Sequence, residues 1–285
     1  MAGFKDLLVV ADNSKACVTR LDVAVHVASR FGAHLTGLFV KEPPNVPDWI
    51  QSEGRVYAPP PSDYAEEQRQ AWREAAQAAQ QLFRSRAGMA GITMEWRERE
   101  GDVAELAILH ARYADMVIVG QTEPAPHAVP SARALPERLL LGVGRPVLVV
   151  PYVGAFKTVG TRVLVAWNAS REATRAVNDA LPILQQASQV TVLAINPRGG
   201  VSGDGDVPGA DLALHLSRHG VNAEASWVPA DDIAVAAMLL SRACDVQADL
   251  IVMGGYGHSR VREIALGGAT REILRTMTVP TLMSH

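Results

Sequence analysis

Short apolar runs alternate with longer amphipathic segments along the first 150 residues. Leu7–Val10 is wholly apolar, and it is followed by Lys15–Phe31, whose apolar residues recur at helical spacing. Nearly all-apolar strands separated by helices are typical of a parallel sheet that helices cover on both faces. The pattern predicts strands at Leu7–Val10, Leu35–Val40, Ile92–Arg97, Met116–Val119 and Val147–Val150, with helices at Lys15–Phe31, Tyr64–Ala87, Val103–Tyr113 and Pro136–Leu141.

The rest of the chain repeats this order, which indicates a tandem duplication. Ala248–Gly254 is similar to Ala114–Gly120 at an offset of 254 − 120 = 134, and the same offset carries Pro280 onto Pro146. We therefore predict two doubly wound α/β domains, each a five-stranded parallel sheet with helices on both faces. Their expected bounds are 1–153 and 160–285, with a linker over 154–160 and second-half strands near 163–167, 190–195, 223–227, 250–253 and 279–283.

Composition narrows the class of protein. The 285 residues are 48% hydrophobic and carry a formal charge of −3, without a dense basic patch, so we expect no nucleic acid partner. No apolar run approaches the length that spans a bilayer, so we expect no membrane association. Cys17 and Cys244 are too few for a disulfide framework or a zinc site. A cytoplasmic location is the interpretation that fits these features.

A glycine pattern near the C-terminus indicates a binding site. Gly254 and Gly257 follow the apolar run Leu250–Met253, and Gly267 comes ten residues after Gly257, ahead of a helix expected to begin near Thr270. Glycine allows close backbone approach, and amides at a helix start bind anions, so the pattern predicts a phosphate cradle. The alternative is that these glycines serve only a tight turn and close packing. His258 follows the second glycine; it could donate a hydrogen bond to a phosphate, or it could lie solvated in its loop.

Together these features resemble the universal stress protein family in its tandem two-domain form. ATP-binding members carry the spacing G-x2-G-x9-G followed by Ser or Thr; Gly254, Gly257 and Gly267 match the glycines, but Gly268 stands at the hydroxyl position. Ser259 or Thr270 could supply that hydroxyl. The resemblance implies a stress-response regulatory protein that binds ATP or AMP, with or without Mg²⁺. Its implied site residues are Ala166, Trp167, Asn168, Ile195, Met253, Gly254, Gly257, His258, Ser259, Gly267, Gly268, Ala269 and Thr270.

The family also places an acidic residue at the tip of the first strand. Asp12 matches it in the first half, whereas Asn168 stands there in the second. By the resemblance, Ala166, Trp167 and Ile195 would frame the adenine. Trp167 could stack on the base or fill the crevice.

The first half has lost the glycine pattern. The offset of 134 places Glu123 on Gly257 and Ala134 on Gly268. A carboxylate at the phosphate position is repulsive, so we expect a nucleotide in the second half alone. Asp12 would then act as a helix N-terminal residue or a loop anchor.

Catalytic groups are not evident in the sequence. We find no nucleophile with a base, no paired carboxylates and no P-loop, and therefore expect a non-enzymatic protein. The alternative to nucleotide binding is an interaction module of the same fold, or a binder of another small ligand. The protein partner stays unknown. The resemblance further implies that Val147–Val150 and Thr281–Met283 pair within the chain as an internal pseudo-dimer, with a homodimer of chains as a further option.

Overall fold

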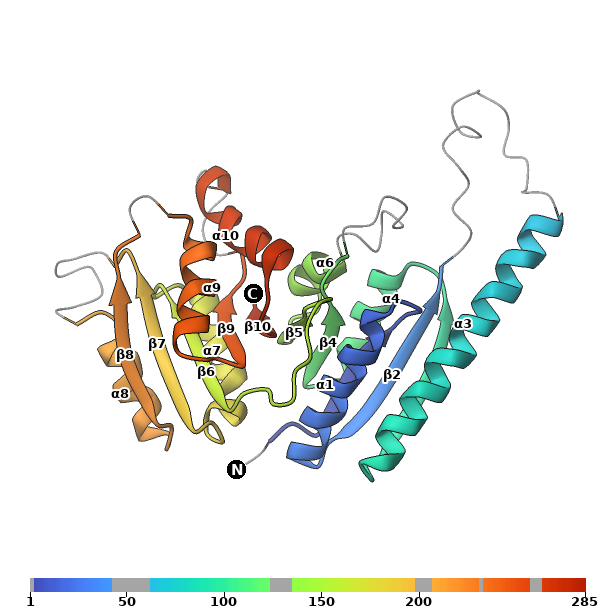
Figure 1. Cartoon of the computed structure of the whole chain (residues 1–285), viewed down its shortest axis with the longest axis horizontal. Coiled ribbons are helices and arrows are strands. Elements are labelled where there is room, and N and C mark those ends of the chain that lie inside the picture. The colour runs from blue at the N-terminus through green and yellow to red at the C-terminus, as the bar shows by residue number, and fades with distance from the viewer. Residues whose placement is uncertain (1–2, 43–61, 124–134, 198–206, 231–232, 257–262) are drawn as a thin grey trace.

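One ten-stranded sheet runs through the whole molecule in the computed structural model (Figure 1). The structure describes residues 3–42, 62–123, 135–197, 207–230, 233–256 and 263–285. The strand order is β3-β2-β1-β4-β5-β10-β9-β6-β7-β8. The strands are β1 (Asp6–Ala11), β2 (His34–Lys41), β3 (Met94–Glu100), β4 (Met116–Gly120), β5 (Val147–Val150), β6 (Arg162–Trp167), β7 (Gln189–Ile195), β8 (Ala223–Val228), β9 (Leu250–Gly254) and β10 (Thr281–Ser284).

Helices cover both faces of this sheet, and each face has its own apolar core. One core joins alternate strand residues to α1, α3, α7 and α8, and the other joins the remaining strand residues to α4, α6, α9 and α10. The helices are α1 (Ala16–Phe31), α3 (Ser62–Met89), α4 (Val103–Ala111), α6 (Leu135–Gly142), α7 (Arg171–Leu184), α8 (Ala210–Arg218), α9 (Val235–Asp245) and α10 (Glu263–Thr276). The predicted doubly wound α/β class is confirmed, and so are the nine elements expected in the first half.

The two halves meet edge to edge. Within each half the strands are parallel, but β5 and β10 pair antiparallel, with Leu148 opposite Leu282. Both leucines are fully buried. This pairing was predicted and is confirmed; it makes the chain an internal pseudo-dimer and protects two edges that would otherwise invite association. Below, the front half means residues 1–153 and the rear half residues 160–285.

The segment between the halves is held at its end. The Asp249 carboxylate accepts hydrogen bonds from the backbone amides of Gly160, Thr161 and Arg162 at 2.9–3.2 Å. From the front half, the Arg30 guanidinium donates to the Val159 carbonyl at 2.7 Å. The expected domain boundaries at 153 and 160 stay predictions, because both halves belong to one sheet.

The start of α10 differs from the prediction. The glycine pattern predicts a helix start near Thr270, with the glycine pair opening it, but α10 begins at Glu263 and runs through Gly267 and Gly268. Helix propagation through a glycine costs only about 1 kcal/mol relative to alanine, and the surrounding residues are good helix formers. The glycine pair therefore lies inside the helix, after the first four amides of the helix start.

Among the helices in the described ranges, none combines the length and apolar character that a membrane crossing requires.

The edge pairing should dominate the stability of the chain. Leu148→Ala is expected to lower the free energy of unfolding by about 3 kcal/mol, because it leaves a cavity at the centre of the sheet. Leu109→Ala, on the exposed side of α4, should cost less than about 0.5 kcal/mol. Urea denaturation of the full chain measures both, and equal costs would contradict the central role of the pairing.

Candidate functional site

A crevice of about 440 Å³ opens in the rear half at the carboxyl ends of β6, β7 and β9. Nine of the thirteen predicted site residues line it: Ala166, Trp167, Asn168, Ile195, Met253, Gly254, Gly268, Ala269 and Thr270. Gly267 lies in α10, whereas Gly257, His258 and Ser259 lie outside the described residues. Residues that are far apart in the sequence are thus brought together at the carboxyl ends of these strands.

Further lining residues were missed by the sequence analysis. They are Ser170, Leu193, Ile233, Ala234, Val235, Ala236, Leu239, Glu272 and Ile273. Several follow β8 at the start of α9, and Ile233 and Val235 are about half exposed. The signal that could have found them is positional: in parallel sheets, ligands bind beyond the carboxyl ends of strands, and this segment follows such an end.

The turn after β6 is built by two polar side chains. The Asn168 Oδ1 atom accepts from the Ser170 amide at 3.2 Å, and the Ser170 hydroxyl accepts from the Ala173 amide at 3.1 Å, capping α7. Between them Ala169 adopts φ of 56°, a left-handed conformation uncommon for a residue with a side chain. The side-chain carbonyl of Asn168 thus shapes the turn. Asn168 itself is exposed and lines the crevice.

Trp167 contributes to the core on the opposite face from the other crevice walls. Its half-buried side chain packs against the core under α7 and α8, whereas Ala166 and Ile195 pack against the core under α9 and α10. Trp167 therefore has a packing role in that core in addition to its place at the crevice, and both interpretations of its role toward a base stay open.

The two glycines of the crevice differ in what they permit. A Cβ atom on Gly254 would lie 2.5 Å from the Ala173 nitrogen and 2.6 Å from the Glu172 carbonyl carbon, so this glycine allows β9 to approach the start of α7. A Cβ atom on Gly268 would meet nothing within 4 Å. Gly254 therefore has a packing role in addition to any role in binding, and Gly268 faces open space.

Charge near the crevice comes mainly from carboxylates. Glu272 is the charged residue among those described as lining it. Glu172 is buried beside Gly254; burial pushes its pKa upward, but the amide at the helix start and the Arg171 guanidinium hold the pKa below its usual value. Glu172 is therefore an ionised carboxylate at the N-terminus of α7.

Thr270, one of the predicted site residues, is joined to Tyr256 by a hydrogen bond. The Tyr256 amide donates to the Thr270 hydroxyl oxygen at 3.2 Å, and Thr270 is 3% exposed. Accepting this bond uses an oxygen lone pair and not the hydroxyl proton. Thr270 lines the crevice and its hydroxyl is bonded to Tyr256; that this hydroxyl could replace the missing family hydroxyl stays a prediction.

The corresponding position of the front half holds a buried guanidinium. The Arg20 Nη1 atom donates to the Val10 carbonyl at 2.6 Å and to the Asp12 carboxylate at 2.8 Å. A Cβ atom on Gly120 would lie 2.7 Å from Nη2. Arg20 therefore lies against the carboxyl ends of β1 and β4. The matched strand starts Leu7 and Val163 align it with Ala176 (20 + 163 − 7 = 176), a fully buried small residue.

Asp12 serves the loop in the way that the sequence predicted. Its carboxylate accepts from the Ser14 amide at 2.9 Å and from the Ser14 hydroxyl at 2.6 Å. Burial alone would raise the pKa of Asp12, but the Arg20 guanidinium and the Ser14 bonds hold the pKa below its ordinary value. Asp12 is a loop anchor and the counter-charge of a buried arginine.

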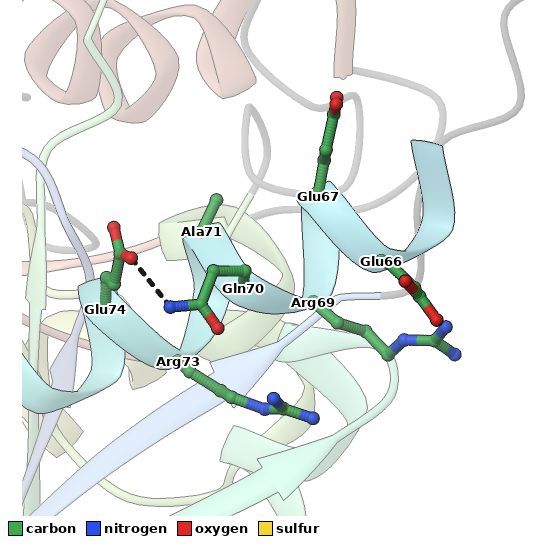
Figure 2. A pocket seen from close by; sticks show the side chains of 7 residues that line it. All are labelled: Glu66, Glu67, Arg69, Gln70, Ala71, Arg73 and Glu74. Atoms are coloured by element: carbon green, nitrogen blue, oxygen red, sulfur yellow. Dashed lines mark hydrogen bonds between the residues drawn. The ribbon is translucent and has the colours of Figure 1, made fainter. Parts of the chain in front are cut away.

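A second hollow, of about 740 Å³, lies along the start of α3. Figure 2 shows that its lining side chains all project from one helix, with the Gln70 amide donating to Glu74 at 2.8 Å. The lining residues are Glu66, Glu67, Arg69, Gln70, Ala71, Arg73 and Glu74. Exposed charges of both signs on one helix stabilise that helix through side-chain pairs. They provide neither the apolar walls nor the convergent polar groups of a ligand site.

The structure offers no alternative metal centre in the described ranges, where no three His, Cys, Asp or Glu side chains gather closely enough to hold an ion. The rings of His215 and His219, at the C-terminal end of α8, lie with their centroids 4.7 Å apart and are tilted by 55°.

Comparisons with known proteins agree with this architecture. The sequence model described as universal stress protein family matches residues 3–151, and the chain belongs to that family. A universal stress protein of Synechocystis sp. is 28% identical over an aligned length of 190 residues, which covers 59% of this chain and 57% of that protein. The chain thus spans a little over half the length of this curated relative.

Solved structures show the same fold over the full chain. A universal stress protein from Archaeoglobus fulgidus DSM 4304 has a TM-score of 0.71 at 17% identity, covering 98% of this chain and 95% of its own. A putative universal stress protein from Pseudomonas aeruginosa UCBPP-PA14 has a TM-score of 0.56 at 13% identity, covering 99% and 93%. The tandem arrangement is therefore shared with chains of very different sequence.

The Arg20–Asp12 pair gives a pH-dependent test. Asp12→Asn keeps the shape but removes the counter-charge of Arg20, and we expect a loss of about 2 kcal/mol in the free energy of unfolding. This is less than the ~3–5 kcal/mol for a fully buried pair, because the Asp12 side chain is 46% exposed. The exposed pair of Arg242 and Asp245 supplies the control Asp245→Asn, expected below about 0.5 kcal/mol.

The sign of the pH dependence follows from the lowered pKa of Asp12. The contribution of the Asp12 carboxylate to the free energy of unfolding is complete above the ordinary carboxyl pKa of about 4. It is lost as the pH falls through the lower pKa that Asp12 has in the folded state. The difference in free energy of unfolding between the unmodified chain and Asp12→Asn should therefore be constant from about pH 5 to pH 7. It should shrink on acidification below about pH 4, and a difference that grows there would contradict this account.

Proposed function

We propose that this member of the universal stress protein family is a stress-response regulatory protein that binds an adenine nucleotide, ATP or AMP, in the rear crevice. Its role is binding rather than catalysis. The observation that carries the proposal is the position of the crevice. It lies beyond the carboxyl ends of β6 and β9, between which the strand order of the rear half reverses. Doubly wound sheets bind nucleotides at this switch point.

The walls of the crevice support an adenine at one end. Leu193, Ile195, Val235 and Leu239 provide an apolar surface, and a volume of about 440 Å³ lies within the usual range for small-molecule sites. A base on this surface would also cover Ile233, which is 51% exposed. Burial of apolar area is the main favourable contribution expected there.

The other end of the crevice suits a phosphate of limited charge. Gly254, Gly268 and Thr270 lie there together, so backbone and hydroxyl groups can approach a ligand closely. Glu272 opposes additional negative charge unless a cation such as Mg²⁺ accompanies the ligand. We therefore propose that AMP binds without Mg²⁺ and that ATP binding depends on it.

A second candidate is a binder of an uncharged small ligand, in which the glycines serve packing alone. Two observations favour it: Glu272 lines the crevice, and Gly268 lies inside α10 rather than at its start. Adenosine and AMP separate the candidates, because they differ only in the phosphate.

Gly268 provides the sharpest test, because the position is open. Gly268→Ser restores the hydroxyl of the family pattern without a clash, and a hydrogen bond to a charged phosphate is worth roughly 1.5 kcal/mol. We expect AMP to bind about tenfold more tightly, adenosine to bind unchanged, and Gly268→Asp to weaken AMP binding by at least as much. Isothermal titration calorimetry measures all three.

Gly88→Ser is the matched control, since Gly88 is also a helical glycine with open space around it, far from the crevice on α3. Nucleotide released from the purified, denatured protein gives an independent measurement. AMP affinities that do not distinguish Gly268→Ser, Gly268→Asp and Gly88→Ser would contradict a phosphate at this end of the crevice.

A further inference from the structure

Helix α6 of the front half packs against the glycine turn of the rear crevice. The backbone of Gly255 lies so close to Leu140 that an added Cβ atom would be 2.3 Å from the Leu140 Cδ2 atom. Leu140 is 3% exposed, so its side chain has little room to move away. Gly255 is thus required for space, and the residue that takes up this space belongs to the other half of the chain.

Tyr256, the next residue of the turn, joins the two halves. Its φ of 51° is left-handed, and its amide donates to Thr270, a lining residue of the crevice. Burial and the neighbouring Glu137 carboxylate of α6 raise the pKa of the Tyr256 hydroxyl to about 12. Glu137 also lies 4.0 Å from the Arg271 guanidinium of α10. One carboxylate of the front half therefore faces both the glycine turn and the helix that lines the crevice.

A second contact holds the other end of α10. The Gln121 side chain, just after β4, donates through Nε2 to the Arg275 carbonyl at 3.0 Å and accepts at Oε1 from the Tyr152 amide at 3.2 Å. Gln121 is 5% exposed. By the offset of 134 it corresponds to Gly255, so the two halves meet through equivalent positions that carry different residues.

We propose that Gln121, Glu137 and Leu140 of the front half are positioning residues of the rear crevice. They hold the turn at Gly254–Tyr256 and helix α10 in the arrangement that binds the ligand. The front half thereby sets the affinity of a site whose described lining residues all come from the rear half. This inference rests on the proposed function for the identity of its ligand.

The contact also predicts a reciprocal effect. If the front half stabilises the ligand-binding arrangement of the turn, a bound ligand must stabilise the contact between the halves to the same extent. The front half is then a part of the chain whose exposed surface can report occupancy of the rear crevice to a partner.

A paired size change tests the proposal in the full chain. Gly255→Ala places a methyl group against Leu140, and we expect AMP affinity to fall about tenfold. Leu140→Ala should weaken AMP binding a few-fold, because the turn loses its support. The double variant should bind AMP more tightly than Gly255→Ala alone, since the new methyl group fills the space that Leu140 leaves.

The matched control is Leu141→Ala, on the neighbouring, 55% exposed residue of α6, which should bind AMP as the unmodified chain does. Gln121→Ala should weaken AMP binding a few-fold; because it also removes two hydrogen bonds of a buried amide, its affinity is compared with that of Leu141→Ala at a temperature where both chains are folded. Losses of affinity that simply add in the double variant would overturn the proposal, and so would unchanged affinity in both single variants.

Hydrogen exchange of the ligand-free chain separates this inference from the proposed function. Amides of 250–256 and 268–276 should exchange faster in Gly255→Ala, and their protection should return in the double variant. If neither AMP, ATP nor adenosine binds the unmodified chain, the proposed function fails, and this exchange pattern alone decides whether the front half positions the turn. Exchange rates equal to those of Leu141→Ala would refute it.

Discussion

The antiparallel pairing of β5 with β10 is the interaction on which the rest of the structure depends. It converts two five-stranded sheets into one, and it brings α6 of the front half beside the glycine turn of the rear half. Backbone hydrogen bonds supply the pairing, while Leu148 and Leu282 bury its centre. Further ties between the halves, at Arg30 with Val159 and at Gln121 with Arg275, add to this pairing, but the pairing is what aligns the two sheets.

The two halves share the same arrangement of strands but differ at the carboxyl ends of their central strands. In the rear half, the carboxyl ends of β6 and β9 open into an apolar crevice with a small residue, Ala176, on the neighbouring helix. In the front half, the guanidinium of Arg20 lies against β1 and β4 and is neutralised by Asp12. In the described part of the chain, the Arg20 Nε atom is the buried side-chain nitrogen or oxygen that lacks a partner. A charge held inside the protein is costly, so the front half depends on that carboxylate for its stability.

Much of the fold could be predicted from the sequence, because apolar runs of strand length and the gapless repeat leave few arrangements open. The crevice was predicted through Gly254, Asn168 and Ile195, which mark strand ends. The start of α10 was not, since two adjacent glycines resemble a boundary, and only tertiary packing shows that the helix continues through them. The role of Arg20 was also missed: a single arginine on a helix gives no periodic signal, and its burial depends on Gly120, which is a hundred residues away in the sequence.

Gly255 and Gln121 show what covalent linkage of the halves permits. In a homodimer with twofold symmetry every substitution at the interface occurs twice, so the two equivalent positions always carry the same residue. Here the equivalent positions are encoded separately and carry different residues. Gly255 leaves room for Leu140, and the Gln121 side-chain amide donates to the Arg275 carbonyl. Covalent linkage thus allows the two sides of this interface to differ in sequence, which two identical chains cannot do.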